Sequence, residues 1–175
     1  MSDISFENRT VIVTGAGNGL GKAYAIELGN RGAKVVVNDL GGAVDGSGSG
    51  NTPADEVVNE IISNGGEAVA NYDSVATKDG GESIVQSAID NFGTVDAVIN
   101  NAGILRDKSF AKLSEEELSL VIDVHLKGAF FVSQPAFKVM KEKNYGRIVN
   151  VASPSGLFGN FGQSNYGAAK MGIVG

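Results

Sequence analysis

The sequence of 175 residues contains no cysteine, no tryptophan, three prolines and one histidine. The absence of cysteine excludes disulfides, cysteine-ligated zinc and thiol catalysis. A single histidine cannot form a multi-histidine metal site, so we expect no bound metal. No apolar run approaches the ~20 residues that cross a bilayer, and the polar N-terminus lacks the apolar region of a signal peptide. We therefore expect no membrane partner.

Basic residues are also scarce, with 14 Lys and Arg against 20 Asp and Glu and a formal net charge of −6. A nucleic-acid-binding surface needs a clustered basic excess, so we expect no nucleic-acid partner. The hydrophobic fraction of 42% is enough to form a core. Glycine is abundant, at 25 residues without a repeating period, which indicates tight turns and close backbone approaches.

Short apolar segments alternate along the chain with segments of helical periodicity. The clearest strand is TVIVT at residues 10–14, whose apolar and β-branched composition is typical of a strand buried on both faces. The alternation predicts an α/β fold, a doubly wound parallel sheet with right-handed crossovers in three α/β/α layers. Strands are expected at residues 10–14, 34–38, 67–72, 95–100 and 147–152, and helices at 20–31, 53–63, 78–92 and 115–143.

Local signals predict where several helices begin and break. Thr52 is expected to cap a helix that has Pro53 at its first position. Ser114 and Glu117 have the spacing of a capping box. Pro135 is expected to kink or divide the helix that follows.

Two segments bear on the domain organisation. Residues 41–51 are rich in glycine and serine, and we expect a long surface loop there, with a lid as the alternative. Residues 168–175 are expected to begin a helix. Because that helix has barely started and no internal repeat or linker precedes it, the sequence predicts that residues 1–175 are the N-terminal part of one domain that is incomplete at its C-terminus.

The glycine cluster TGAGNGLG at residues 14–21 lies where the first strand passes into the first helix. Glycines there let the backbone approach a pyrophosphate, and the helix N-terminus supplies free N–H groups. The spacing is Gly-x3-Gly-x-Gly on Gly15, Gly19 and Gly21, and Leu20 stands where the commoner fingerprint has its last glycine. This position favours a nucleotide site; the alternative is a flexible loop.

Asp39 ends the second strand, at about the separation expected of a ribose-binding acid, ~20 residues after the glycine turn. Its carboxylate can accept hydrogen bonds from the adenosine hydroxyls and would repel a 2′-phosphate. Asn18, Asn38 and Leu40 supply no compensating cation, so NAD is favoured over NADP. The alternative is an acid that simply faces water.

Tyr166 and Lys170 are four residues apart on the last expected helix and therefore share a helix face. An ammonium group close to a phenol favours the phenolate. The pair can thus supply a general base near neutral pH. The spacing is common by chance, so a pair of surface residues is the alternative.

Taken together, these motifs resemble the short-chain dehydrogenase/reductase family from about residue 8 to the end. The likeness rests on the glycine turn, on NNAG at residues 100–103 after the fourth strand, on Tyr166 with Lys170, and on Ser153 thirteen residues before the tyrosine. The resemblance implies a Rossmann-like fold. Four motifs in this order at these element boundaries are specific to the family.

The resemblance also implies residue roles. Tyr166 would be the acid/base, Lys170 would bind the nicotinamide ribose, and Ser153 would hold the substrate oxygen beside Tyr166. Ser155 competes for that role, but its spacing to the tyrosine is wrong by two residues. The cofactor contacts implied are Gly15, Asn18, Gly19, Leu20, Gly21, Asp39, Asp73, Ser74, Asn101, Ala102, Gly103, Tyr166 and Lys170.

The sequence departs from the family pattern at His125, where many members carry an asparagine that completes a proton relay. The histidine belongs to the apolar face of its expected helix and should point inwards. One interpretation makes it a catalytic residue whose ring replaces the asparagine amide. The other makes it a hydrogen-bonded core residue.

Further segments are similar to the (3R)-hydroxyacyl-CoA dehydrogenase region of type 2 peroxisomal multifunctional β-oxidation enzymes. This subgroup shares the histidine, and Ser153-Pro154 is similar to its fungal members. The resemblance implies NAD-dependent oxidation of a (3R)-3-hydroxyacyl-CoA to the 3-oxoacyl-CoA, in peroxisomes, by a homodimer or an intrachain pair of dehydrogenase regions. The segments lie at residues 37–42, 101–107, 124–126, 145–148 and 159–163.

Two other functions stay open at this point. A 3-oxoacyl thioester reductase of fatty-acid synthesis has a similar stretch at residues 159–163 but usually prefers NADPH, which Asp39 disfavours. A cofactor-binding scaffold without catalysis is the second, and the presence of Ser153, Tyr166 and Lys170 argues against it.

Overall fold

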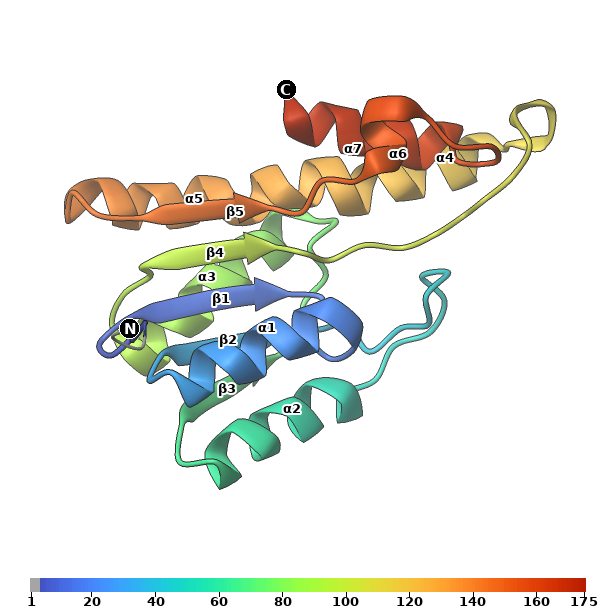
Figure 1. The fold of residues 1–175 in the computed structure, drawn as a ribbon. Coiled ribbons are helices and arrows are strands. Elements are labelled where there is room, and N and C mark those ends of the chain that lie inside the picture. Colours follow the sequence, from blue (N-terminus) through green and yellow to red (C-terminus); the bar gives the residue numbers. More distant parts are fainter. Residues whose placement is uncertain (1–3) are drawn as a thin grey trace.

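The computed structural model describes residues 4–175 and contains one parallel sheet with the strand order β3-β2-β1-β4-β5 (Figure 1). The strands are β1 Thr10–Thr14, β2 Lys34–Asn38, β3 Glu67–Asn71, β4 Ala97–Asn100 and β5 Arg147–Asn150. The helices are α1 Gly19–Asn30, α2 Thr52–Ser63, α3 Lys78–Phe92, α4 Glu115–Ile122, α5 Gly128–Glu142, α6 Pro154–Phe158 and α7 Ser164–Val174. Two shorter turns are η1 Phe110–Lys112, a 3₁₀ turn, and η2 Asp123–Lys127, a π-helical turn.

Side chains of the central strands enter two separate cores because successive residues of a strand face opposite sides of the sheet. Val11 and Val13 of β1 pack with α1 and α2, whereas Ile12 between them packs with α3 and α5. The three-layer doubly wound fold expected from the sequence is therefore confirmed. Within residues 4–175, no helix is long and apolar enough to cross a membrane.

Pro135 was expected to kink or divide its helix, and the expected division is wrong. It lies inside the continuous helix α5. A proline cannot donate to the carbonyl four residues earlier, here that of Phe131, and crowds it. That carbonyl lies against Gly81 of α3, where a Cβ atom would overlap it. The close approach of the two helices at a glycine gives the carbonyl room, and the helical path instead becomes irregular at η2.

Other element boundaries differ by a few residues from those expected. Thr52 is the first residue of α2 rather than its cap, and Asn51 before it has helical dihedrals and no side-chain capping bond. The capping box of Ser114 and Glu117 is confirmed. The last helix begins at Ser164, earlier than expected, and α6 has no counterpart in the sequence prediction.

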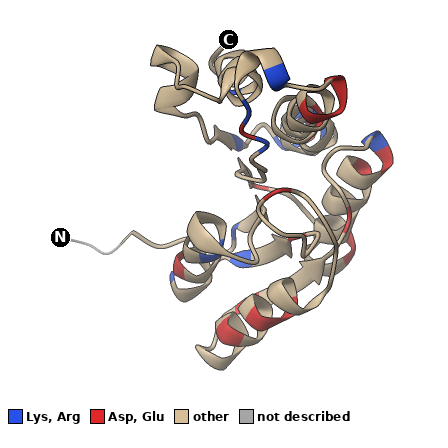
Figure 2. Ribbon diagram, turned by 90° about the vertical axis from the view of Figure 1, so that its right-hand side faces the viewer, with Lys and Arg blue, Asp and Glu red and all other residues tan. Residues whose placement is uncertain are grey.

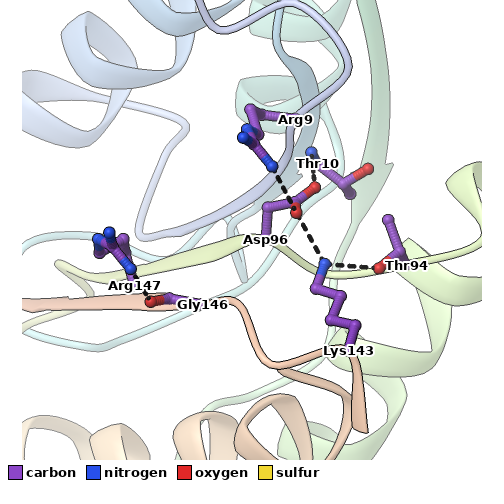
Figure 3. A network of polar contacts seen from close by, with 7 residues as sticks. All are labelled: Arg9, Thr10, Thr94, Asp96, Lys143, Gly146 and Arg147. Atoms are coloured by element: carbon purple, nitrogen blue, oxygen red, sulfur yellow. Dashed lines mark hydrogen bonds and ion pairs between the residues drawn. The ribbon is translucent and has the colours of Figure 1, made fainter. Parts of the chain in front are cut away.

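A buried ionic network joins the amino ends of three strands (Figure 3). The carboxylate of Asp96 accepts hydrogen bonds from the Thr10 amide at 2.8 Å and from Lys143 Nζ at 2.7 Å, and Arg9 lies at 3.5 Å. Burial alone would raise the pKa of Asp96, but these donors and charges hold it below its ordinary value. The network joins the amino ends of the strands, whereas the glycine turn follows the carboxyl end of β1.

The β5 strand forms one edge of the sheet, since its ladder partner is β4. All four of its residues are exposed, including the apolar Ile148 and Val149. Beside it, Phe137, Met140 and Tyr145 contribute to a hollow of about 420 Å³. An unpaired apolar edge of this kind is a template for further strand pairing.

Candidate active site

The glycine turn is built so that side chains cannot occupy its inner side. Gly15 has a φ of +62°, and a Cβ atom there would lie 2.7 Å from the Cα of Ala102. A Cβ on Gly21 would overlap the carbonyl of Gly15. Gly19 also has a positive φ, of +55°, but nothing lies within 4 Å of its missing Cβ. The first and last glycines are thus required by packing, and the middle one borders open space.

The N-terminus of α1 follows directly and has unused hydrogen-bonding capacity. Asn18 precedes the helix without a side-chain capping bond, and the first turn contains no acidic residue. The first N–H groups of a helix have no intrahelical partner and carry partial positive charge. Together with the open space at Gly19, they form a cradle for an anion such as a pyrophosphate. Leu20 on this turn is exposed.

Asp39 holds the glycine turn through its carboxylate. Its Oδ2 accepts from the Gly17 amide and its Oδ1 from the Gly41 amide, both at 2.7 Å. Each oxygen keeps a lone pair for a further donor. No Lys or Arg among residues 4–175 forms an ion pair with Asp39. The carboxylate therefore presents a negative charge beside the turn.

Asn101 fastens β4 to the same turn. Its side-chain amide donates to the carbonyls of Thr14 and Gly15, each at 3.0 Å. In return, the Thr14 hydroxyl accepts from the amides of Asn101 and Ala102 at 3.1 Å. The structure therefore gives Asn101 a holding role, and its contact with a cofactor stays a prediction. Thr14, which sequence reasoning did not select, is the hub of this arrangement.

Asp73 belongs to a second polar cluster, at the carboxyl ends of β2 and β3. Its Oδ2 accepts from Asn71 Nδ2 at 2.9 Å and from the Ser83 hydroxyl at 2.7 Å. Asn38 donates to the Asp73 carbonyl at 2.9 Å. Ser74 uses its hydroxyl to accept from the Ala76 amide at 3.2 Å. The cluster fixes Asp73 at the edge where an adenine would lie; its contact with adenine is a prediction.

Tyr166 and Lys170 lie on one face of α7, as the four-residue spacing predicts. The Lys170 Nζ is 5.7 Å from the centroid of the Tyr166 ring and donates to the Val151 carbonyl at 2.6 Å. Lys170 is buried, and this burial lowers its pKa. The tyrosine is half-buried. A cation held next to a reachable phenol is the arrangement that a tyrosine base requires.

Ser153 caps α6 after the end of β5. Its Oγ accepts from the Ser155 amide at 3.2 Å, which leaves the hydroxyl hydrogen free to donate. The Ser155 hydroxyl instead donates to Gln163 Oε1 at 2.9 Å. The competing serine is thus engaged with another side chain.

His125 packs against Tyr166 from η2. The two rings lie edge to face, with centroids 5.1 Å apart. Its Nε2 is 3.0 Å from the Ile104 amide nitrogen and 2.8 Å from the Ile104 carbonyl oxygen, and the tautomer decides which group it bonds. Burial lowers the pKa of His125 to about 4, with a smaller contribution from the charge of Lys170. The ring is therefore neutral near pH 7, and its predicted inward orientation is confirmed.

A small cavity lies between these groups. Its volume is about 10 Å³, close to the space of one water molecule. The Nδ1 of His125 is buried and, within the described residues, has no hydrogen-bond partner. A Cβ atom on Gly103 would overlap the histidine ring, so this glycine makes the approach possible. The cavity lining includes Thr14, Asn100, Ala102, His125, Val151 and Lys170.

Two further asparagines position the site and were given no role from the sequence. Asn165 is fully buried, its Nδ2 donates to the Arg106 carbonyl at 2.9 Å, and its Oδ1 accepts from the Tyr166 amide at 2.8 Å. Asn100 donates to Asn150 Oδ1 and to the Ser133 hydroxyl, both at 2.8 Å. A polar residue directly before the tyrosine was the available signal for the first. Matching asparagines at the ends of β4 and β5 were the signal for the second.

The site thus combines an anion cradle, a carboxylate beside it that forms no ion pair within residues 4–175, and a tyrosine flanked by a buried lysine and a neutral histidine. The family model for the short chain dehydrogenases matches residues 9–175. The chain belongs to the short-chain dehydrogenase family. It is accordingly an oxidoreductase that acts on hydroxyl groups, in a family that binds NAD or NADP.

Relatives of this short-chain dehydrogenase include peroxisomal and bacterial proteins. It is 59% identical over 173 residues to the peroxisomal hydratase-dehydrogenase-epimerase of Saccharomyces cerevisiae, covering 99% of this chain and 19% of that protein. It is 57% identical over 169 residues to a short-chain type dehydrogenase/reductase of Mycobacterium tuberculosis, covering 97% and 59%. The full-length peroxisomal multifunctional enzyme type 2 of Drosophila melanogaster superposes with a TM-score of 0.80 at 47% identity, covering 98% and 27%. The chain therefore spans less than two thirds of the length of each.

Proposed function

We propose that this chain oxidises (3R)-3-hydroxyacyl-CoA to 3-oxoacyl-CoA with NAD as the cofactor. The observation that carries the proposal is the packing of Lys170 and His125 on Tyr166, because this lysine and histidine also line a cavity with Thr14 at the end of β1 and Ala102 after β4. Support for the substrate comes from the similarity to peroxisomal hydratase-dehydrogenase-epimerase and multifunctional enzymes. The same similarity supports a peroxisomal location, and a homodimer or an intrachain pair of dehydrogenase regions as the active form.

The residues present fit a dinucleotide, because the glycine turn keeps open space at Gly19 that a side chain would fill. The N–H groups at Gly19 and Leu20 would hold the pyrophosphate, and Asp39 would accept from the adenosine ribose. Asp73 would lie at the adenine, and Lys170 at the nicotinamide ribose. When bound, NAD supplies the acceptor for the hydride. The carboxylate of Asp39 favours NAD because it would repel the 2′-phosphate of NADP.

Tyr166 and Ser153 act on the substrate hydroxyl in different ways. The Tyr166 phenolate takes the hydroxyl proton, and the nearby ammonium of Lys170 stabilises that phenolate. The Ser153 hydroxyl donates a hydrogen bond to the same oxygen, since its lone pair, not its hydrogen, is used by the Ser155 amide. These two interactions orient the carbon–hydrogen bond at C3 towards the cofactor.

His125 has two functions in this proposal. The edge of its ring packs against the Tyr166 ring, and its Nδ1 can accept a hydrogen bond at the cavity that Lys170 also lines. For this tautomer, Nε2–H donates to the Ile104 carbonyl. Because accepting a hydrogen bond adds no charge to the ring, the low pKa of His125 is compatible with this role.

A Tyr166→Phe variant tests the proposal. Tyr145→Phe, before the amino end of β5, is the matched control. NADH formation should be measured on the natural full-length protein with (3R)- and (3S)-3-hydroxyacyl-CoA. We expect the first variant to lose about 10²–10⁴-fold in kcat and the control to lose less than about twofold. A Tyr166→Phe variant as active as the wild type would contradict the mechanism. NAD binding without turnover of either substrate would favour a scaffold, and a preference for NADPH with a 3-oxoacyl thioester would favour the reductase.

A further inference from the structure

The segment that joins β4 to α4, residues 104–113, forms a strap along one side of the site (Figure 1). Its Leu105 amide donates to the Val44 carbonyl at 2.9 Å, and its Lys108 amide to the Gly162 carbonyl at 2.8 Å. Asp107 accepts from Gln163 Nε2 at 2.9 Å. The strap is therefore held on one side by the loop after β2 and on the other by the segment that leads into α7.

The strap is also where positive charge gathers beside the site. Arg106, Lys108 and Lys112 lie within seven residues of one another, with Asp107 as the one acid of the segment. Figure 2 looks onto this side of the molecule and shows blue segments on the strap, while red dominates α2. Three cations thus lie on the strap of a chain of net charge −6, and the first turn of α4 after it contains Glu115, Glu116 and Glu117.

The two lysines differ from the arginine in how closely acids approach them. Within residues 4–175, Lys112 forms no ion pair and Lys108 has a single long one, at 3.8 Å to Glu117. Arg106 forms no ion pair there either, but its charge helps to lower the pKa values of Asp45 and Glu117. The Arg106 Nε is buried and has no acceptor in that part of the chain. These are donors without acceptors, next to a site for a substrate.

We propose that Lys108 and Lys112 bind the phosphate groups of the substrate's nucleotide handle, so that the strap selects CoA thioesters over thioesters without phosphates. This inference rests on the proposed function and names the part of the substrate that the strap recognises. Guanidinium and ammonium groups are the side chains that bind phosphate most strongly. The strap thereby supplies the charge that an acidic protein otherwise lacks for a polyanionic substrate.

The path of the strap suits this role. Arg106 is joined through Asn165 to the amide of Tyr166, so the strap begins next to the proposed base. From there it runs outward, turns back in a loop and reaches the start of α4 (Figure 1). Lys112 lies in the 3₁₀ turn Phe110–Lys112 of this loop. Phe110, between the two lysines, is 82% exposed and offers a face on which an adenine can stack.

The test compares binding of (3R)-3-hydroxydecanoyl-CoA with that of the matching pantetheine thioester, which has the same acyl arm but no nucleotide. Calorimetry without NAD gives both dissociation constants on the natural full-length protein. The variant is Lys108→Ala/Lys112→Ala, and Lys138→Ala/Lys141→Ala on α5 is a control with the same change in net charge.

We expect the strap double variant to weaken CoA thioester binding by about 10- to 100-fold, roughly tenfold for each ammonium–phosphate hydrogen bond removed. The pantetheine thioester should shift by less than about twofold, and the α5 control should keep the CoA preference. Equal weakening for both ligands, or none for either, would overturn the inference. Turnover is measured separately: a wild type that binds the CoA thioester through the strap but does not oxidise it would refute the proposed function and leave the strap assignment supported.

Discussion

Replacing Asp39 with asparagine should shift the cofactor preference from NAD towards NADP. The carboxylate has one backbone donor on each oxygen, from Gly17 and Gly41. The asparagine keeps one carbonyl oxygen, places an amide NH₂ where the other oxygen was, and removes the negative charge. The turn thus loses one acceptor, and the ribose loses a charged hydrogen-bond partner.

The magnitude follows from those two changes. A hydrogen bond to a charged group contributes about 1.5–3 kcal/mol, so we expect kcat/KM for NAD to fall by roughly 10- to 150-fold. A carboxylate about 5 Å from a phosphate charge repels it by roughly 3 kcal/mol at an effective dielectric constant of 20. Removing that repulsion should raise kcat/KM for NADP by about 100-fold. The ratio of the two therefore changes by about three orders of magnitude.

The assay is the initial rate with each cofactor at one substrate concentration near saturation, together with the dissociation constant of each cofactor. Asp45→Asn serves as the matched control, because this exposed acid lies in the following loop and bonds with Ser47. The control should keep the wild-type preference within about twofold. An Asp39→Asn enzyme that still rejects NADP and uses NAD as well as the wild type does would refute the assignment of Asp39 to the ribose.

Three other changes test the structure at separate places. Lys143→Met should lower the free energy of unfolding by about 2 kcal/mol, because buried Asp96 loses its shortest charged hydrogen bond. Urea unfolding measures this free energy, and a midpoint equal to that of the wild type would contradict a stabilising role of the Asp96 network. Gly21→Ala should lower Tm and weaken cofactor binding at least tenfold, since its Cβ would overlap the Gly15 carbonyl; unchanged binding would count against the tight turn. His125 is neutral in the fold with a pKa of about 4 against an ordinary 6.5, so unfolding takes up a proton between these pH values and the stability present above pH 6.5 declines as the pH falls to 4. His125→Asn should reduce that loss of stability by about 3 kcal/mol. The measurement is the free energy of unfolding at pH 7 and at pH 4, and an equal decrease in the wild type and the variant would exclude the histidine as the cause.

The sequence was sufficient for the layers of the fold because local patterns and burial agree there. Residues 10–14 are apolar on both faces of a central strand, and α3 has the predicted bounds of Lys78–Phe92. A strand with apolar residues on both faces can only be buried between two helical layers. Alternation of such strands with helices then leaves few topologies.

The sequence was insufficient where a contact distant in the chain decides the outcome. The effect of Pro135 depends on Gly81 in another helix, which leaves room for the Phe131 carbonyl. Local propensity contains no information about that approach. The short helix α6 was missed because five residues give too little periodicity to detect.

The residues of the candidate site also fall into two groups, those that the sequence predicts and those that only the fold identifies. Glycine spacing and the i, i+4 pair of Tyr166 and Lys170 depend on local geometry, and the structure places them as expected. The roles of Thr14 and Asn165 depend on hydrogen bonds across 87 and 59 residues of chain, respectively. Their residue types are common, so only the assembled fold distinguishes them from ordinary polar residues.

The π-helical turn η2 interrupts the regular winding between α4 and α5. Such a turn accommodates one more residue than a regular α-helical turn, and here it presents His125 to Ile104 and Tyr166. Removing one residue from Asp123–Lys127 would restore regular winding and leave α4 and α5 in the same alignment, because the wide turn already absorbs that residue. The damage from such a deletion would therefore be confined to the wide turn itself, where His125 would lose its place beside Ile104 and Tyr166.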